Sequence, residues 1–74
     1  MTCLLSEMPQ GGNATVVDFN DTHLAQRMLM LGVRRGTNIQ IVQGPNARGT
    51  VIMVGGARLA LGREAADGIC VNAT

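Results

Sequence analysis

Short stretches of alternating apolar and polar residues predict a chain made mostly of β-strands. Residues 14–19 are rich in β-branched and aromatic side chains, and in the segment 37–43 two isoleucines alternate with polar residues. Gly55-Gly56 has the form of a two-residue hairpin turn, whereas residues 44–49 read as a turn or short loop. The predicted strands are 14–19, 37–43, 50–54, 57–61 and a last one that includes 69–71.

One segment has the period of an amphipathic helix, from residue 22 to residue 31. Helix-capping residues precede it at positions 20–22, and Gly32 follows it, where a C-terminal glycine is expected. The predicted core-facing stripe consists of Leu24, Ala25, Met28, Leu29 and Leu31. On this pattern Leu31 docks the helix against the strands. A single further helical turn is predicted at 63–67.

The number and length of these elements predict a mainly β fold in a single domain, residues 1–74. Ten glycines divide the chain into short pieces, about twice the roughly 5 that average usage would give. About five strands, with one short helix between the first and second, are too few for two large packed sheets. We therefore expect a small, strongly bent barrel that closes its own edges.

The charges exclude several classes of protein. All six basic residues are Arg and Lys is absent, so the chain contains no phosphate-binding loop of the GxxxxGK type. The formal net charge is only +1, which argues against nucleic acid as a partner. No segment has the ~18–20 apolar residues of a membrane span, and no signal peptide is recognisable, so we expect a cytoplasmic protein that does not insert into the membrane.

Reactive side chains are scarce. His23 is the single histidine and lies beside Asp21 at the start of the helix, and no pair of cysteines or histidines has metal-ligand spacing. We therefore expect no metal site and no cofactor; any metal would bridge molecules through His23, Asp21 or a cysteine. No catalytic set is recognisable, so we do not expect an enzyme. Cys3 and Cys70 are expected to be free thiols, because nothing indicates export.

A surface for protein–protein contact is the better candidate. Arg27, Met30 and Arg34 fall at i, i+3 and i+7, on a line offset from the core stripe, and an exposed methionine between arginines is typical of interfaces. We predict that this line, together with Arg63, binds a partner; the alternative is a solvated face. Phe19 is the single aromatic residue and is expected to fill the core, which argues against a groove for proline-rich peptides.

Four motifs, in order and at matching spacing, resemble the FeoA family of ferrous iron transport accessory proteins. They are LSEMP at 5–9, RMLMLGVRRG at 27–36, GARLAL at 56–61 and ADGICV at 66–71. The family usually has Pro where this chain has Arg35, a residue that loosens the turn before Gly36. It often has a basic residue at the position of Gly62, and commonly a polar or acidic one at the position of Met30.

The resemblance implies an SH3-like barrel in a bacterial, non-enzymatic protein of ferrous iron uptake. Its implied partner is FeoB, a membrane transporter with a cytoplasmic GTPase domain. The chain would bind or regulate FeoB, and through that partner it would be peripheral at the inner membrane. The alternative is a metal-linked regulatory module similar to the C-terminal domain of DtxR-type iron-dependent repressors. Such a module follows a winged-helix DNA-binding domain, and we expect none in a chain that reads as one small domain from Met1. Exposed strand edges and methionines favour self-association.

Overall fold

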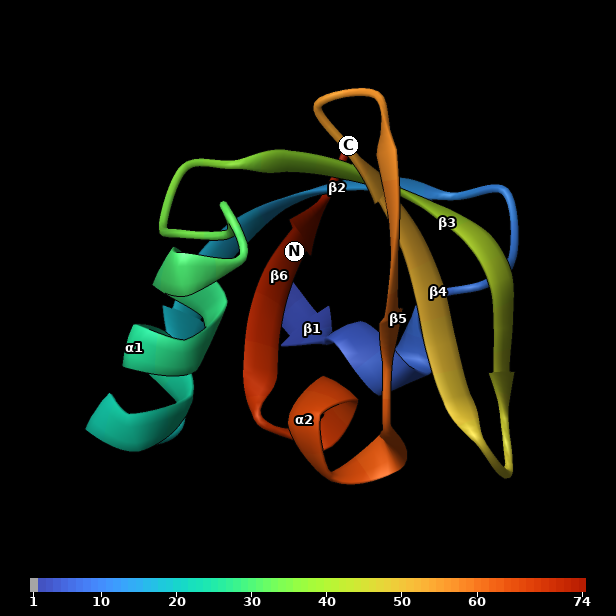
Figure 1. Ribbon diagram of the computed structural model, residues 1–74. Coiled ribbons are helices and arrows are strands. Elements are labelled where there is room, and N and C mark those ends of the chain that lie inside the picture. The colour runs from blue at the N-terminus through green and yellow to red at the C-terminus, as the bar shows by residue number, and fades with distance from the viewer. Residues whose placement is uncertain (1) are drawn as a thin grey trace.

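The computed structural model describes residues 2–74, and its strands form one antiparallel sheet in the order β1-β6-β2-β3-β4-β5 (Figure 1). The strands are β1 (Thr2–Leu4), β2 (Asn13–Phe19), β3 (Asn38–Asn46), β4 (Gly49–Val54), β5 (Ala57–Leu61) and β6 (Ile69–Ala73). The helices are the 3-10 turn η1 (Leu5–Glu7) and the α-helices α1 (Thr22–Met30) and α2 (Arg63–Asp67). A mainly β fold with α1 between β2 and β3 is thereby confirmed.

Two parts of the sheet differ from the prediction. The strand β1 was not predicted, because three residues are too few to show an alternating pattern. The segment 44–49 contains the expected turn, but only at residues 47–48: β3 continues through Pro45 to Asn46, and β4 begins at Gly49. Gly44 has a φ of +87°, and the pairing of β3 with β4 shifts register on both sides of Gln43. These irregularities bend the strand without ending it, as β-bulges do.

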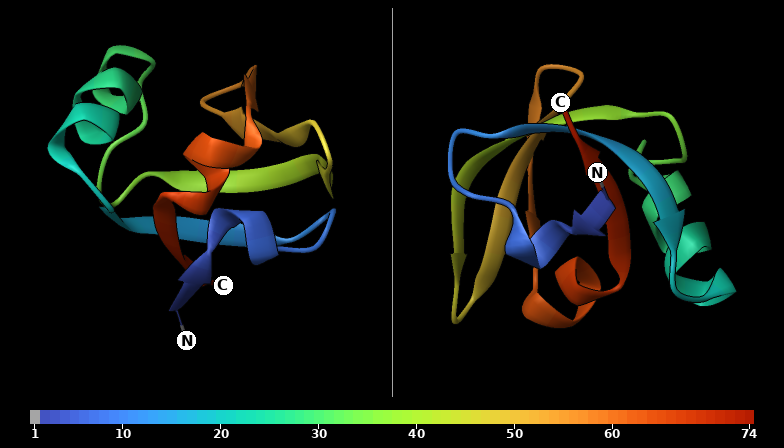
Figure 2. Two further views of the ribbon diagram at one scale, coloured as in Figure 1. Left: turned by 90° about the horizontal axis from the view of Figure 1, so that it is seen from below. Right: turned by 180° about the vertical axis from the view of Figure 1, so that it is seen from behind.

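The bent sheet wraps around one apolar core, and η1 and α2 lie against that core. Figure 1 shows α2 between the lower ends of β5 and β6, and Figure 2 shows α1 apart from it at one end of the sheet. Phe19 is buried, which confirms its predicted place in the core. The largest fully buried side chains are Leu5, Met28, Ile41, Ile52, Ile69, Val16, Val33, Val71 and Thr50. No helix within residues 2–74 combines the length and the apolar character needed to cross a membrane.

The pairing of β2 with β6 is irregular near the end of β2. Val16 pairs with Val71, but the next pair is Asp18 with Cys70, so the register shifts between Val16 and Asp18. Val17 and Asp18 are both exposed, whereas Val16 is buried. The bulge thus places the Asp18 carboxylate on the outer surface, beside the chain that returns from α1.

The cysteines lie on neighbouring strands but on opposite faces of the sheet. Cys3 pairs with Val71, a core residue, and packs against the core, whereas Cys70 pairs with Leu4, which is exposed. Paired residues of antiparallel strands share a face, so the two thiols point apart. Both thiols are free, as expected, and this geometry prevents a disulfide without movement of the backbone.

Candidate interaction surface

Helix α1 is fixed to the sheet at its N-terminal end. The Asp21 side chain caps the helix by accepting a hydrogen bond from the backbone N–H of Leu24 at 2.7 Å. Leu24 and Met28, one turn apart, are buried and join the core. These two side chains dock the helix, Ala25 packs against the same core, and the other residues of α1 are exposed.

The C-terminal end of α1 is a Schellman motif. Gly32 has a φ of +86° and donates to the carbonyl of Leu29 at 3.1 Å, and Val33 donates to the carbonyl of Met28 at 2.8 Å. This pair of bonds satisfies carbonyls that the helix would otherwise leave open, and it turns the chain sharply after Leu31. Val33 is fully buried in the same core cluster as Met28, as is usual for the apolar residue that follows this motif.

The prediction that Leu31 and Leu29 face the core is wrong. Helical spacing stops at Met30, and the left-handed Gly32 carries Val33 into the position that Leu31 was expected to fill. Leu29 is 57% exposed, Met30 87% and Leu31 52%. These three consecutive residues form an exposed group that we call the apolar tip. Its middle member, Met30, was correctly predicted to be exposed.

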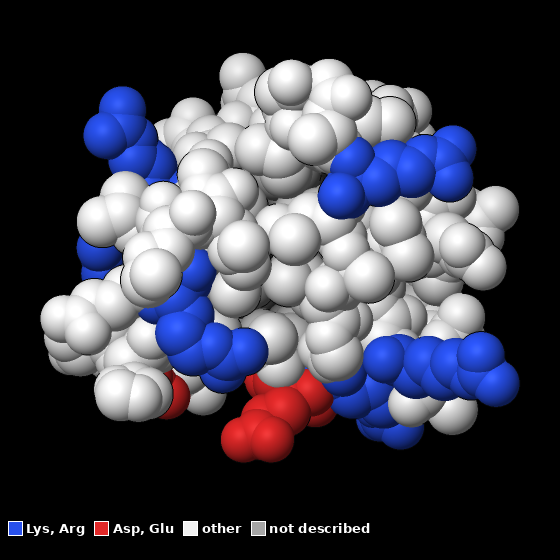
Figure 3. All heavy atoms as spheres, in the orientation of Figure 1, with Lys and Arg blue, Asp and Glu red and all other residues white. Residues whose placement is uncertain are grey.

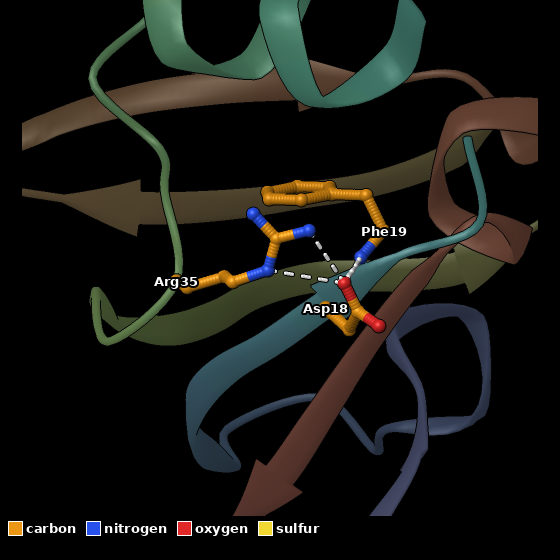
Figure 4. Close-up of polar contacts among 3 residues, drawn as sticks. All are labelled: Asp18, Phe19 and Arg35. Atoms are coloured by element: carbon orange, nitrogen blue, oxygen red, sulfur yellow. Dashed lines mark hydrogen bonds and ion pairs between the residues drawn. The ribbon is translucent and has the colours of Figure 1, made fainter. Parts of the chain in front are cut away.

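The chain that follows the apolar tip is held against β2 by an ion pair. The Asp18 carboxylate accepts hydrogen bonds from Arg35 Nη2 at 2.7 Å and Nε at 3.1 Å, and from the Phe19 backbone N–H at 2.9 Å. The Arg35 guanidinium carbon lies 5.7 Å from the centre of the Phe19 ring. In Figure 4 the ring lies between this guanidinium and α1. Arg35, which replaces the usual Pro of the resemblance, was expected to loosen the turn; this ion pair instead holds the turn against β2.

The same ion pair lowers the pKa of Asp18. Hydrogen bonding from Arg35 is the main cause, and the hydrogen bond from the Phe19 backbone adds to it. Backbone bonds brace the turn as well: Val16 donates to Thr37 at 2.9 Å, and Gly36 donates to Val16 at 2.8 Å. The apolar tip therefore stands on a turn that is fixed on both sides.

The three arginines of the predicted partner-binding set line three different hollows, and Met30 lies on the open surface of the helix. Arg27 lines a hollow of about 330 Å³ between α1 and α2, with Gly62 and Glu64 on its far side. Arg34 lines a hollow of about 310 Å³ on the opposite flank of α1. Met30, in the apolar tip, lies on the helix surface between these flanks. Arg63 belongs to α2 and lines a third hollow, of about 270 Å³, beside the β3–β4 hairpin.

The predicted line is thus real in part. Arg27 and Arg34 are both exposed and flank the apolar tip from two sides, although Arg34 lies in the turn and not on the helix. Arg63 is not part of this group. Figure 3 shows the basic side chains of the visible face in separate places, with acidic side chains gathered near α2 between them.

The apolar hollow beside α1 was not predicted. Its lining consists of Phe19, Ala25, Gln26, Leu29, Arg34 and Arg35. We call it the Phe19 hollow. The sequence did carry a signal for part of it, because a glycine followed by an apolar residue after a helix is the mark of a Schellman motif. The contact of Asp18 with Arg35 had no such local signal, since 17 positions separate them.

Two further polar features of the molecule bear on chemistry. His23, Asp21 and Glu64 line the hollow between α1 and α2, but the described residues contain no group of three His, Cys, Asp or Glu side chains that could hold a metal ion. Thr50 is 2% exposed, and its hydroxyl has no hydrogen-bond partner within residues 2–74. This hydroxyl is a local cost to stability and does not form a reactive set.

The fold and the surface together define a class: a small SH3-like barrel whose most distinctive exposed feature is the end of a helix. A model of the FeoA domain matches residues 3–73. The chain therefore belongs to the FeoA family, as the motifs indicated. A search among curated proteins found no match.

Solved structures with the same fold include other FeoA proteins. The crystal structure of an iron uptake regulatory protein (FeoA) has a TM-score of 0.90 and 29% identity, over 100% of both chains. FeoA from Stenotrophomonas maltophilia, a procaryotic SH3 domain protein crystallised with zinc, has a TM-score of 0.79 and 29% identity, over 95% of this chain and 89% of that one. A manganese-dependent transcriptional repressor in complex with manganese has a TM-score of 0.90 but 19% identity, over 99% of this chain and 37% of that one. The fold is thus shared with part of a metal-dependent repressor.

Proposed function

We propose that this chain is a cytoplasmic accessory protein of ferrous iron uptake that binds a FeoB-type membrane transporter through the end of α1. The apolar tip is the observation that carries the proposal. Met30 is 87% exposed and lies between two leucines that are each more than half exposed. Three consecutive apolar residues add nothing to the core in that position, and contact with another protein is the ordinary reason for such a group.

The surroundings of the tip suit a binding role. Arg27 and Arg34 provide charged contacts on its two flanks, and arginine is among the residues enriched at interfaces. The Asp18–Arg35 pair and the Schellman motif hold the tip in place before binding, which reduces the entropy lost on association. Arg63 lines a separate hollow beside the β3–β4 hairpin, so it belongs to the proposal only as a second contact, distinct from the apolar tip.

The direct test is binding to a FeoB-type transporter, both full-length in detergent and as its cytoplasmic GTPase domain, with and without guanine nucleotide. We expect saturable binding by biolayer interferometry, and Met30→Glu should weaken it about tenfold or more, as loss of an interface anchor does. Ala57→Glu introduces the same charge on an exposed position of β5 and should leave binding unchanged. Absence of binding in every nucleotide state would overturn the proposal.

A second candidate function is a regulatory module that responds to metal. The likeness in fold to the manganese-dependent repressor favours it. This function requires that Fe(II) or Mn(II) bind the chain, so equilibrium dialysis discriminates between the two candidates. One site per molecule with micromolar affinity would support the regulatory module, whereas no binding would leave the transporter accessory.

A further inference from the structure

The Phe19 hollow has an apolar wall and a rim that carries two arginines. Ala25 and Leu29 line it along α1, and Phe19, itself only 8% exposed, lies at its base. Arg34 and Arg35 line the side formed by the turn. A volume of about 310 Å³ is at the lower end of the roughly 300–1,000 Å³ typical of ligand sites, so it suits one or two inserted side chains.

The charge around this hollow is one-sided. The sequence has no acidic residue from Thr22 to Gly62, a stretch that contains all of α1 and the turn after it. The nearby carboxylate of Asp18 is already bonded to Arg35, in the one ion pair found within residues 2–74. Arg34 uses its backbone N–H to bond the Thr37 hydroxyl, and its guanidinium has no acidic partner within residues 2–74. The positive charge of Arg34 at the rim of the Phe19 hollow is therefore not balanced by a carboxylate of the described residues.

We propose that the Phe19 hollow and the apolar tip together bind an acidic segment of a partner protein. A large apolar side chain of that segment packs against Leu29 and Phe19, and carboxylates on either side of it pair with Arg34 and Arg27. This inference rests on the proposed function in that it names the chemistry that the partner presents to the same site. Charge complementarity of this kind fixes the register of binding and raises the association rate.

A second copy of the chain fits the site less well. In a two-fold dimer through the Phe19 hollow, Arg34 would face the same basic rim of the other copy, and like charges at an interface cost free energy. An anionic membrane surface is also less suitable. The exposed apolar group is three residues long, whereas helices that lie on membranes present a continuous apolar face.

The test uses a phage-displayed library of random dodecapeptides, selected on the wild-type protein after depletion on the Leu29→Ser, Arg34→Glu double variant. We expect the enriched peptides to share one large apolar residue with Asp or Glu near it. In an NMR titration, a synthetic copy of one enriched peptide added to ¹⁵N-labelled protein should shift the amide signals of α1 and the turn at 31–37. Affinity should fall about tenfold with either Leu29→Ser or Arg34→Glu, and again between about 50 and 300 mM salt.

The matched control is Arg58→Glu, which reverses an exposed arginine on β5 and should not change peptide affinity. Arg34→Gln, which removes the charge without reversing it, should give a smaller loss than Arg34→Glu. The inference is overturned by enriched peptides without acidic residues, by no enrichment, or by signal shifts elsewhere. It is also overturned by tip-dependent binding of anionic lipid vesicles or by tip-dependent dimers in ultracentrifugation.

These outcomes are separable from those for the transporter. If a FeoB-type transporter binds independently of salt and of Arg34, the proposed function is supported and the inference of an acidic segment is overturned. Selection of acidic peptides at the tip, with no transporter binding, would do the reverse.

Discussion

Met28 and Met30 are two residues apart on one helix, and the structure treats them in opposite ways. Met28 is 1% exposed and Met30 is 87% exposed. Both belong to a run of four apolar residues, 28–31, so hydrophobicity alone does not separate them. The Schellman motif does, because it ends the helix and directs Val33 into the core beside Met28. The comparison teaches that burial depends on where a residue falls relative to the helix end, and that the exposed part of an apolar run is free for binding.

The largest effect is expected from truncation of the buried methionine. Met28→Ala should lower the free energy of unfolding by about 2–5 kcal/mol, because it removes packed atoms and leaves a cavity. Met30→Ala should change it by less than about 0.5 kcal/mol. Urea unfolding followed by circular dichroism measures both. Equal losses at the two positions would refute the division of the run into a core part and an exposed part.

A smaller loss is expected at the glycine that ends the helix. Gly32→Ala places a side chain at a φ of +86° and should cost about 1–2 kcal/mol, although nothing lies within 4 Å of the added Cβ. Gly62→Ala is a suitable control, since Gly62 has a φ of −64° and equally open surroundings. Thermal unfolding should therefore show a clear drop for the first variant and little change for the second. If the two variants unfold alike, the left-handed turn is not what separates Leu31 from Val33.

Thr50 is the opposite case to Met30, because it is a polar residue in the core. Removal of its hydroxyl should therefore raise the free energy of unfolding, whereas the changes above lower it. Thr50→Val removes a hydroxyl that has no partner within the described residues, so it should raise the free energy of unfolding by about 1 kcal/mol. Thr50→Ser keeps the hydroxyl and loses a methyl group, and it should destabilise the protein. Loss of stability in Thr50→Val would mean that the hydroxyl makes a bond in solution.

The smallest effect concerns the tether beneath the apolar tip. The folded pKa of Asp18 is lowered, so the pair contributes to stability at pH values above the unfolded pKa, and this contribution is lost as the pH falls through the folded pKa. Arg35→Ala should raise the pKa of Asp18 toward its ordinary value, which NMR titration of the carboxyl carbon measures. Both side chains are exposed, so only a slight change in overall stability is expected. An unchanged titration would mean that the pair is not formed in solution.

Local patterns were sufficient for most of the fold. The alternation around Ile39 and Ile41 and the period of Leu24 and Met28 are set by the geometry of a strand and a helix, and both residue pairs are buried as expected. The family resemblance pointed to the same SH3-like barrel. The family model confirms the family, and the solved FeoA structures confirm the fold.

What escaped prediction depended on contacts that the local pattern does not contain. The strand β1 is defined by its pairing with β6, at the other end of the chain. The tether joins Asp18 to Arg35 only because a bulge exposes the carboxylate on the side where the turn returns. For the candidate site, Met30 was found from the sequence, but its leucine neighbours and the Phe19 hollow required knowledge of how the helix ends.

The pairing of β1 with β6 also bears on how this fold can be used in longer chains. Thr2 lies opposite Asn72 in the ladder, so the chain leaves the barrel beside the point at which it enters. A domain of this kind can be inserted into a loop of another protein without forcing the two ends of that loop apart, or it can be joined to another domain at either terminus. The same geometry makes the barrel a natural subject for circular permutation, with new termini opened at the Gly55–Gly56 turn, which lies far from α1 in Figure 1.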